Sequence, residues 1–187
     1  GDVMFDASIF YNKISDQESS ILEQLDIVDT EYMLLTIHRR ENTSSKVKLE
    51  NIMHGLEESG RNIIWPLHPG TKIQIEQFNI AIPENIKIIN PVGYLDMISL
   101  QKNARLIITD SGGVQKESYF YQVPCIILRD ETEWVELVEN GYSILTGSDS
   151  KCIKEAINSM TLTEIDGKYL YGQGDAAEKI VRIMADY

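Results

Sequence analysis

The segment Ser111-Gly112-Gly113 points most directly to chemistry by its residue types and spacing. It follows the apolar stretch 106–109 and precedes a predicted helix over 113–121. Two glycines at such a point let the backbone approach a ligand closely, because no Cβ intervenes. The free amides and the dipole of a helix start favour an anion such as phosphate. Ser111 could cap this helix or donate to the same phosphate.

Glu117 lies four residues beyond Gly113, one helical turn further along the same face. A carboxylate there could accept both hydroxyl groups of a ribose while the helix start holds the phosphates. The alternative is a glycine turn followed by a solvated glutamate. The sequence contains neither G-x-G-x-x-G nor the P-loop pattern G-x-x-x-x-G-K-[ST], so a dinucleotide site and a Walker-type site are not favoured.

Three potential cations, His38-Arg39-Arg40, follow the apolar stretch 32–37, and Glu41 comes directly after them. Arginine suits bidentate contact with phosphate, and a histidine near phosphate can be charged near neutral pH. We therefore expect at least one of the three cations to contact an anionic ligand, and we count Arg39 among the substrate-binding candidates. The alternative is that one arginine pairs with Glu41 and the other is solvated.

Two more polar segments follow predicted strands. His68, before Pro69, is predicted either as a second donor to the ligand or as a structural histidine, and it is kept as a substrate-binding candidate. Arg129-Asp130 is expected to include a structural ion pair, and Arg129 is also a substrate-binding candidate. The nearby Trp134 is expected to be packed rather than stacked on a base.

Composition narrows the possible functions. The 187 residues carry 29 acidic and 17 basic side chains, and the net charge of −12 argues against nucleic-acid binding through a basic face. No apolar run approaches the ~20 residues of a membrane span, and we expect a cytoplasmic protein. The three histidines lack metal-ligand spacing, so neither a metal nor a cofactor is predicted. Cys125 and Cys152 are expected to be buried thiols, and no paired carboxylates stand out as an acid–base couple.

Apolar strand patterns and helical periodicities alternate along the chain. The predicted strands are 32–37, 62–65, 86–89, 106–109, 124–128 and 142–145. The predicted helical segments lie in 1–25 with a break at 15–17, around 49–56, in 94–104 and 113–121, around 153–160, and in 177–184. Short, uniformly apolar strands separated by helices indicate an α/β protein, with a Rossmann-like parallel sheet covered by helices on both faces. Ligands bind beyond the carboxyl ends of such strands, where the candidate residues lie. No linker divides the chain, so residues 1–187 are predicted to form one domain.

Several motifs together resemble the C-terminal domain of the bacterial non-hydrolysing UDP-N-acetylglucosamine 2-epimerases. They are His38-Arg39-Arg40-Glu41-Asn42, Asp110-Ser111-Gly112-Gly113-Val114-Gln115-Lys116-Glu117, Arg129-Asp130-Glu131-Thr132-Glu133 and Tyr171-Gly172-Gln173-Gly174-Asp175-Ala176. The opening 1–7 resembles the segment where the chains of that family cross into the second domain. The resemblance covers nearly all of the chain, in order.

This resemblance implies one half of a two-domain GT-B architecture built from two Rossmann-like halves. The family inverts C2 of UDP-GlcNAc to give UDP-ManNAc, by eliminating UDP and adding it back. Ser111, Gly112 and Gly113 match the diphosphate loop of the family. Glu117 matches the ribose acceptor, and His38 matches a histidine that could stabilise charge on the leaving UDP, so we assign His38 a catalytic role.

In the family, the carboxylates that move the C2 proton come from the N-terminal domain. The chain begins at Gly1 rather than Met, and we expect it to be a piece of a longer protein. We therefore expect it to be inactive alone, with a UDP-sugar and its own N-terminal domain as partners. The resemblance also implies a homodimer of the full-length protein and a role in cell-surface polysaccharide biosynthesis.

Three positions depart from the family pattern. Val92 stands where a glutamine near the uracil is usual, and Met97 replaces a following aromatic residue, so backbone groups in 91–94 are expected to read the base. Trp134 stands where members with a T-E-R-P-E run have arginine. The run 132–136 looks more like the branch that handles other UDP-sugars, including diacetamido-uronic acids, and this branch is an alternative assignment.

The sequence is also compatible with two further classes of protein. One is the donor-binding domain of a GT-B glycosyltransferase, whose retaining members often carry two glutamates eight positions apart. The position eight after Glu117 is Cys125, which weighs against that class. The second class is a UDP-sugar sensor or a structural module without catalytic activity.

Overall fold

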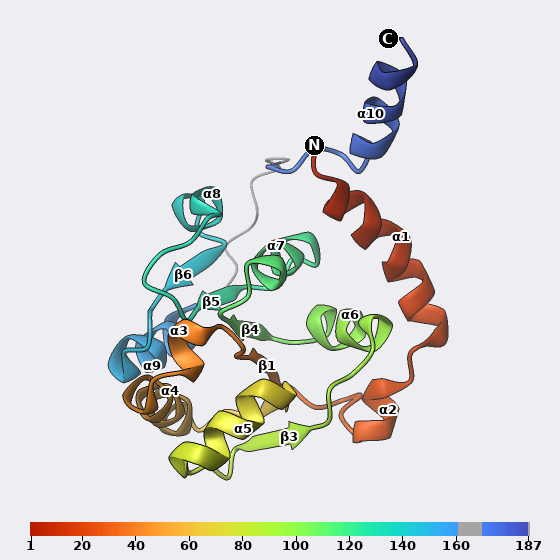
Figure 1. The fold of residues 1–187 in the computed structure, drawn as a ribbon. Helices are drawn as coiled ribbons and strands as arrows, with labels where there is room; N and C mark the ends of the chain where they lie inside the picture. The colour runs from red at the N-terminus through yellow and green to blue at the C-terminus, as the bar shows by residue number, and fades with distance from the viewer. Residues whose placement is uncertain (161–169, 187) are drawn as a thin grey trace.

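The computed structural model describes residues 1–160 and 170–186. The strands in these ranges are β1 (Met33–Thr36), β2 (Ile63–Pro66), β3 (Ile86–Ile89), β4 (Leu106–Thr109), β5 (Cys125–Ile127) and β6 (Ser143–Leu145). The helices are α1 (Val3–Glu18), α2 (Ile21–Leu25), α3 (Arg40–Thr43), α4 (Lys46–Ser59), α5 (Pro69–Phe78), α6 (Tyr94–Lys102), α7 (Gly112–Phe120), α8 (Val135–Glu139), α9 (Ser150–Ser159) and α10 (Ala176–Ala185). Figure 1 shows their arrangement.

The strands form one parallel sheet in the order β3-β2-β1-β4-β5-β6. This is the strand order of the Rossmann fold, so the predicted fold class is confirmed. In the register of β1 and β4, Thr36 lies opposite Thr109, and their hydroxyl oxygens are 2.6 Å apart. The two strands therefore end side by side, and the polar segments that follow them are neighbours.

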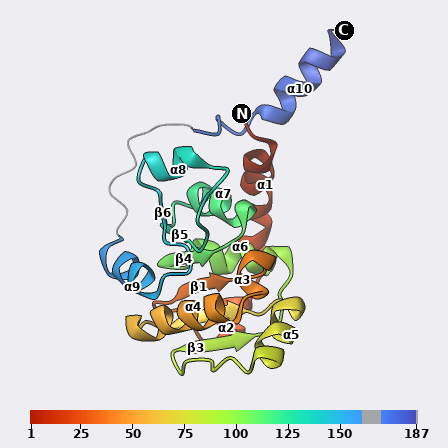
Figure 2. The same cartoon turned by 60° about the vertical axis from the view of Figure 1, so that its left-hand side comes forward.

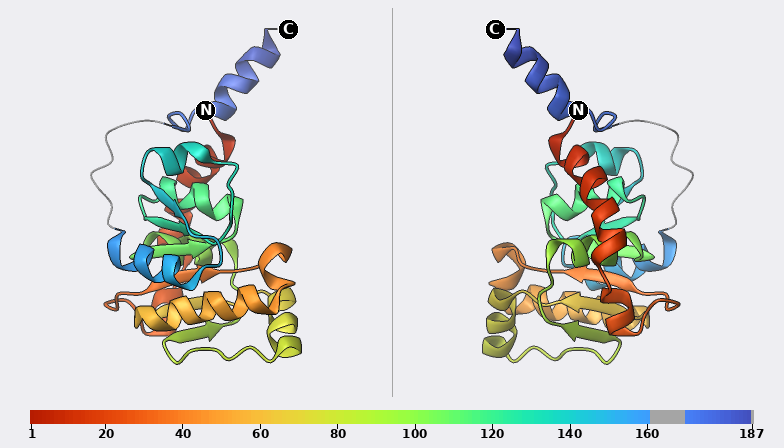
Figure 3. Two further views of the ribbon diagram at one scale, coloured as in Figure 1. Left: turned by 90° about the vertical axis from the view of Figure 1, so that its left-hand side faces the viewer. Right: turned by 90° about the vertical axis from the view of Figure 1, so that its right-hand side faces the viewer.

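Alternate residues of the central strands β1 and β4 enter two different cores. On one face, Leu35 of β1 and Ile108 of β4 pack with α4, α5 and α9. On the other face, Leu34 and Ile107 pack with residues of α2 and α6. Helices cover both faces (Figure 3), which explains why the central strands have no polar side in the sequence.

Several elements differ from the prediction. The break in the N-terminal helical segment lies at Ser19 and Ser20, between α1 and α2, rather than at 15–17. Helix α5 was not predicted; it begins at Pro69, and His68 is its cap. Cys125 is buried as expected, but Cys152 is exposed because it lies beside the buried stripe of α9.

Helix α10 extends away from the sheet and contacts α1 (Figure 2). The Asp6 carboxylate accepts hydrogen bonds from the backbone amides of Ala176 at 3.2 Å and Ala177 at 2.7 Å, which ties the start of α10 to α1. Its predicted apolar residues Ile180, Val181 and Met184 are 47 to 72% exposed. The helix is therefore present as predicted, but most of its apolar surface is uncovered. No helix in the described ranges is long and apolar enough to cross a bilayer.

Candidate functional site

The four polar segments singled out in the sequence lie at one edge of the sheet. They follow β1, β2, β4 and β5, which are consecutive neighbours in the strand order. All strands are parallel, so their carboxyl ends share this edge. The fold therefore brings the predicted residues together, although they are up to 91 positions apart between His38 and Arg129.

The start of α7 offers free amides toward this edge. Ser111 is the N-terminal cap residue, but within the described ranges its side chain makes no capping hydrogen bond. The first amides of an α-helix have no acceptor inside the helix. A Cβ at Gly112 would lie 3.6 Å from Nη2 of Arg39. Gly112 therefore faces a guanidinium group at a helix start, an arrangement that suits a phosphate.

Gly113 and Trp134 also lie at the start of α7. The indole Nε1 of Trp134 donates to the carbonyl of Gly112 at 2.9 Å, and the Lys116 ammonium lies 4.3 Å from the centre of the indole ring. Trp134 is thus packed, as predicted. A Cβ at Gly113 would face Met4 of α1 at 3.6 Å, so Gly113 marks the side on which α7 meets α1.

Asp110 fixes the segment that carries His38 and Arg39. This carboxylate is fully buried, and it accepts from the backbone amides of both residues at 3.0 Å and from Nδ2 of Asn42 at 3.1 Å. Its Oδ1 also lies 3.6 Å from Nδ1 of His38. The end of β4 therefore holds the end of β1 in place. The sequence shows Asp110 as part of a motif but gives no sign of this anchoring role.

His38 and His68 line a cleft of about 230 Å³ at the same edge. Their ring centres are 6.2 Å apart. His68 is the cap of α5, and its Nδ1 accepts from the Gly70 amide at 3.1 Å. This contact fits the prediction of a structural histidine. It also leaves Nε2 for a ligand. The remaining lining is mostly apolar: Thr36, Ile37, Pro66, Pro91, Val92, Met97 and Val114. Such a mostly apolar cleft with two histidines suits one flat ring.

A larger pocket of about 370 Å³ lies at the opposite edge of the sheet, where Tyr32, Asn62 and Arg105 line it. None of the predicted site residues is in its lining. Parallel sheets bind ligands at the carboxyl ends of their strands, so we place the site at the smaller cleft.

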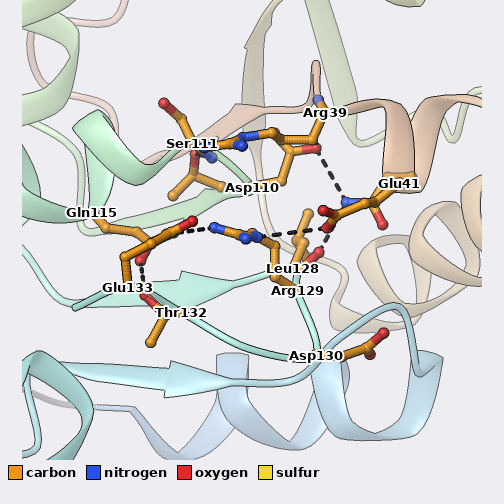
Figure 4. A network of polar contacts seen from close by, with 12 residues as sticks. Arg39, Glu41, Asp110, Ser111, Gln115, Leu128, Arg129, Asp130, Thr132 and Glu133 are labelled. Atoms are coloured by element: carbon orange, nitrogen blue, oxygen red, sulfur yellow. Dashed lines mark hydrogen bonds and ion pairs between the residues drawn. The ribbon is translucent and has the colours of Figure 1, made fainter. Parts of the chain in front are cut away.

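Arg129 lies inside a network of ion pairs (Figure 4). Its side chain is 5% exposed, its Nη1 donates to Glu133 at 2.7 Å, and its Nε lies 3.6 Å from Glu41. The bond to Glu133 raises the pKa of Arg129, and the same contact lowers the pKa of Glu133. Asp130 instead lies 3.5 Å from Lys48. The predicted segment therefore does include a structural ion pair, but Arg129 forms it with Glu133 rather than with Asp130. The partner of Glu41 is Arg129 rather than Arg39 or Arg40.

This network has an electrostatic consequence for the helix start. Glu133 Oε2 would lie 3.6 Å from a Cβ at Gly112, close to the proposed phosphate position. A bare carboxylate there would repel a phosphate, and Arg129 balances its charge. The structure thus supports a charge-balancing role for Arg129, and its direct contact with substrate stays a prediction.

Glu117 is buried, at 7% exposure, on the α7 face that meets α6. Its Oε2 accepts from Nε2 of Gln101 at 2.8 Å, and its Oε1 lies 3.5 Å from the Tyr94 hydroxyl. Burial raises the pKa of Glu117, while the contacts with Gln101, Tyr94 and Lys116 oppose that rise. The carboxylate is therefore held in place rather than solvated. Gln101 was not among the predicted site residues, since nothing in its spacing relates it to Glu117.

We expect Glu117→Gln to raise the melting temperature at pH 7. The folded chain raises the pKa of Glu117, so an ionised carboxylate costs stability above that pKa. The gain should shrink as the pH falls through the raised pKa of Glu117, and it should be nearly gone below the ordinary value of 4.5, because Glu117 is then protonated in both the folded and the unfolded chain. Thermal melts at pH 7 and pH 4 measure both effects. A melting temperature lowered at pH 7 would count against a destabilising buried charge.

Comparison with known proteins identifies the family to which this chain belongs. A sequence model of the family described as UDP-N-acetylglucosamine 2-epimerase matches residues 1–185. A UDP-N-acetylglucosamine 2-epimerase homolog from Methanococcus maripaludis is 44% identical over 98% of this chain and 53% of its own length. A UDP-2,3-diacetamido-2,3-dideoxy-D-glucuronate 2-epimerase from Pseudomonas aeruginosa is 39% identical over 99% of this chain and 51% of its own length.

The fold has close counterparts among solved structures. The crystal structure of UDP-GlcNAc 2-epimerase from Methanocaldococcus jannaschii, in complex with UDP-GlcNAc and UDP, aligns with a TM-score of 0.90 and 39% identity. The alignment covers 100% of this chain and 54% of that one. The chain thus spans about half the length of the relatives it matches.

Proposed function

Because this chain belongs to the UDP-N-acetylglucosamine 2-epimerase family, we propose that it is the UDP-binding half of a UDP-sugar 2-epimerase. The whole protein would convert UDP-GlcNAc into UDP-ManNAc by eliminating UDP and adding it back. One observation carries the proposal: Arg39 lies beside the free amides of α7, with the buried Glu117 further along the same helix. Gly113 and Glu117 lie one helical turn apart on α7, so one helix could serve both the diphosphate and the ribose.

The three parts of UDP have distinct places in this proposal. The diphosphate lies against the amides of Gly112 and Gly113, with Arg39 as its counter-charge. The ribose hydroxyls bind Glu117. The uracil enters the cleft bordered by Val92 and Val114, which offers apolar contact to the faces of the base.

His38 is proposed to act on the leaving UDP. Breaking the bond between the sugar and UDP leaves negative charge on the diphosphate, and an imidazolium beside it would offset that charge. Asp110 holds the backbone amide of His38, so the ring is placed by a buried anchor. His68 lies across the cleft and is proposed as a second donor.

The chain alone is expected not to epimerise UDP-GlcNAc. No acid–base pair of carboxylates stands out in the sequence, and proton transfer at C2 requires one. We propose that these groups belong to a second half that precedes this chain in the whole protein. Incubation with UDP-GlcNAc, followed by proton NMR, should show no epimer, whereas the whole protein should show turnover. Robust turnover by the chain alone would refute this division of roles.

Helix α10 is proposed as a contact with that second half. Ile183 is 60% exposed and Met184 is 72% exposed, on a helix whose buried residues include only Ala176 in the described ranges. Apolar surface of this kind usually packs against a partner. The proposal also includes a homodimer of the whole protein, which the family resemblance implies, and a cytoplasmic location. Sedimentation analysis and cell fractionation test these two parts.

A second substrate has support from one comparison. The relative named UDP-2,3-diacetamido-2,3-dideoxy-D-glucuronate 2-epimerase is 39% identical to this chain. The segment that carries Trp134 also resembles that branch. Turnover assays of the whole protein with each UDP-sugar decide between the two substrates.

Glu117→Ala is expected to weaken UDP binding by about 1–3 kcal/mol, which is the range for a lost hydrogen bond to a charged group. Isothermal titration of the chain with UDP measures this change. A matched control is Glu139→Ala, because Glu139 lies at the end of α8, outside the proposed site. Equal UDP affinity in the wild type and Glu117→Ala would count against the ribose role of Glu117.

A further inference from the structure

The two oxygens of the Glu117 carboxylate are held unequally. Oε2 accepts a hydrogen bond of 2.8 Å from Nε2 of Gln101, which lies on α6 and is fully buried. Oε1 lies 3.5 Å from the hydroxyl of Tyr94, a residue that is 44% exposed. The first contact has normal length, and the second is at the outer limit of a hydrogen bond.

Because of this inequality, Oε1 can still accept a hydrogen bond from a ligand. An ionised carboxylate has about four lone-pair positions, and Gln101 occupies one of them. A ligand hydroxyl could replace the long Tyr94 contact at Oε1 at little cost. Meanwhile the Gln101 bond would keep the carboxylate from rotating about its own axis.

Gln101 itself is not fully satisfied. Within the described residues, its Oε1 is buried without a hydrogen-bond partner. A buried acceptor of this kind lowers stability, and a leucine would fill the same place without that cost. The bond to Glu117 is therefore the polar contact that distinguishes Gln101 from an apolar residue.

We propose that Gln101 is a positioning residue that orients Glu117 toward the hydroxyl groups of a ribose, so that the site selects ribonucleotides over deoxyribonucleotides. This inference rests on the proposed function, in which Glu117 accepts the ribose. It adds a second residue, on a different helix, to the recognition of the sugar. Gln101 does not touch the ligand in this proposal. It acts on ligand binding only by holding Glu117 in place.

The test compares two nucleotides that differ only in the sugar. Isothermal titration measures binding of UDP and of 2′,3′-dideoxyuridine 5′-diphosphate to the full-length protein. The proteins are the wild type, Gln101→Leu, Glu117→Ala and a control, Gln115→Leu. Gln115 is a matched control because it is also fully buried, and its Oε1 accepts from Thr132 rather than contacting Glu117.

We expect Gln101→Leu to bind UDP about tenfold more weakly and to bind the dideoxy compound within about twofold of the wild type. Glu117→Ala should likewise lose the preference for UDP, and Gln115→Leu should keep it. Circular dichroism and thermal melts confirm that each variant is folded.

Three results would overturn the inference. They differ in whether the proposed ribose role of Glu117 also fails. If Gln101→Leu weakens both nucleotides equally, Gln101 has only a structural role. If Gln101→Leu keeps the preference for UDP while Glu117→Ala loses it, the role of Gln101 fails and the ribose role of Glu117 stands. If Glu117→Ala also keeps the preference, the ribose assignment in the proposed function fails as well.

Discussion

We expect Gly112→Val to abolish UDP binding and to leave the fold intact. A Cβ at Gly112 would lie 3.4 Å from Trp134 Nε1 and 3.6 Å from Arg39 Nη2, which are ordinary contact distances. The helix start can therefore accept a Cβ at this position, and the neighbouring atoms all belong to side chains. The two methyl groups of valine, however, would occupy the space between the helix start and the Arg39 guanidinium, where we place the diphosphate.

The expected loss is large because two hydrogen bonds to a charged group disappear together. At about 1.5–3 kcal/mol each, this corresponds to roughly 10² to 10⁴-fold weaker binding. Gly112→Ala, with a single methyl group, should give an intermediate loss. Titration calorimetry measures the affinity, and a thermal melt confirms folding. Normal UDP affinity in folded Gly112→Val would place the diphosphate elsewhere.

We expect Asp110→Ala to lower the free energy of unfolding by about 3–5 kcal/mol. The change leaves the amides of His38 and Arg39 and the side chain of Asn42 without their carboxylate acceptor, at a position that is fully buried. Each unsatisfied buried donor costs about 1–3 kcal/mol. For a chain of this size the melting temperature should fall by roughly 6–20 °C.

Asp130→Ala is the matched control for this prediction. Its side chain is 78% exposed, and its contact with Lys48 is a surface ion pair of 3.5 Å. Such pairs contribute little, so the free energy of unfolding should change by less than about 1 kcal/mol. Denaturant titrations of both variants give the two values. A similar, small effect at both positions would mean that Asp110 does not anchor the His38 segment.

The sheet could be predicted from the sequence because its strands are marked by their composition. Ile107 and Ile108 are both apolar because they face different cores, and that pattern is local. Helix α5 could not be found in this way. Its apolar residues Ile73 and Ile75 do not follow a helical stripe, and Ile73 is 59% exposed.

The candidate site was predictable where it depends on a single segment. Ser111 and Gly112 form the helix start that their residue types indicate. Contacts between distant segments were not predictable. Arg129 pairs with Glu41 at a separation of 88 positions, and Gln101 contacts Glu117 across two helices. Spacing along the chain contains no information about such pairs, since the order of strands in the sheet creates them.

A crystal structure of the chain with UDP tests the central claim most directly. We predict diphosphate oxygens within hydrogen-bond distance of the amides of Gly112 and Gly113, the ribose on Glu117 and the uracil in the cleft beside Val92. A diphosphate found in another pocket, with the start of α7 left free, would contradict this placement.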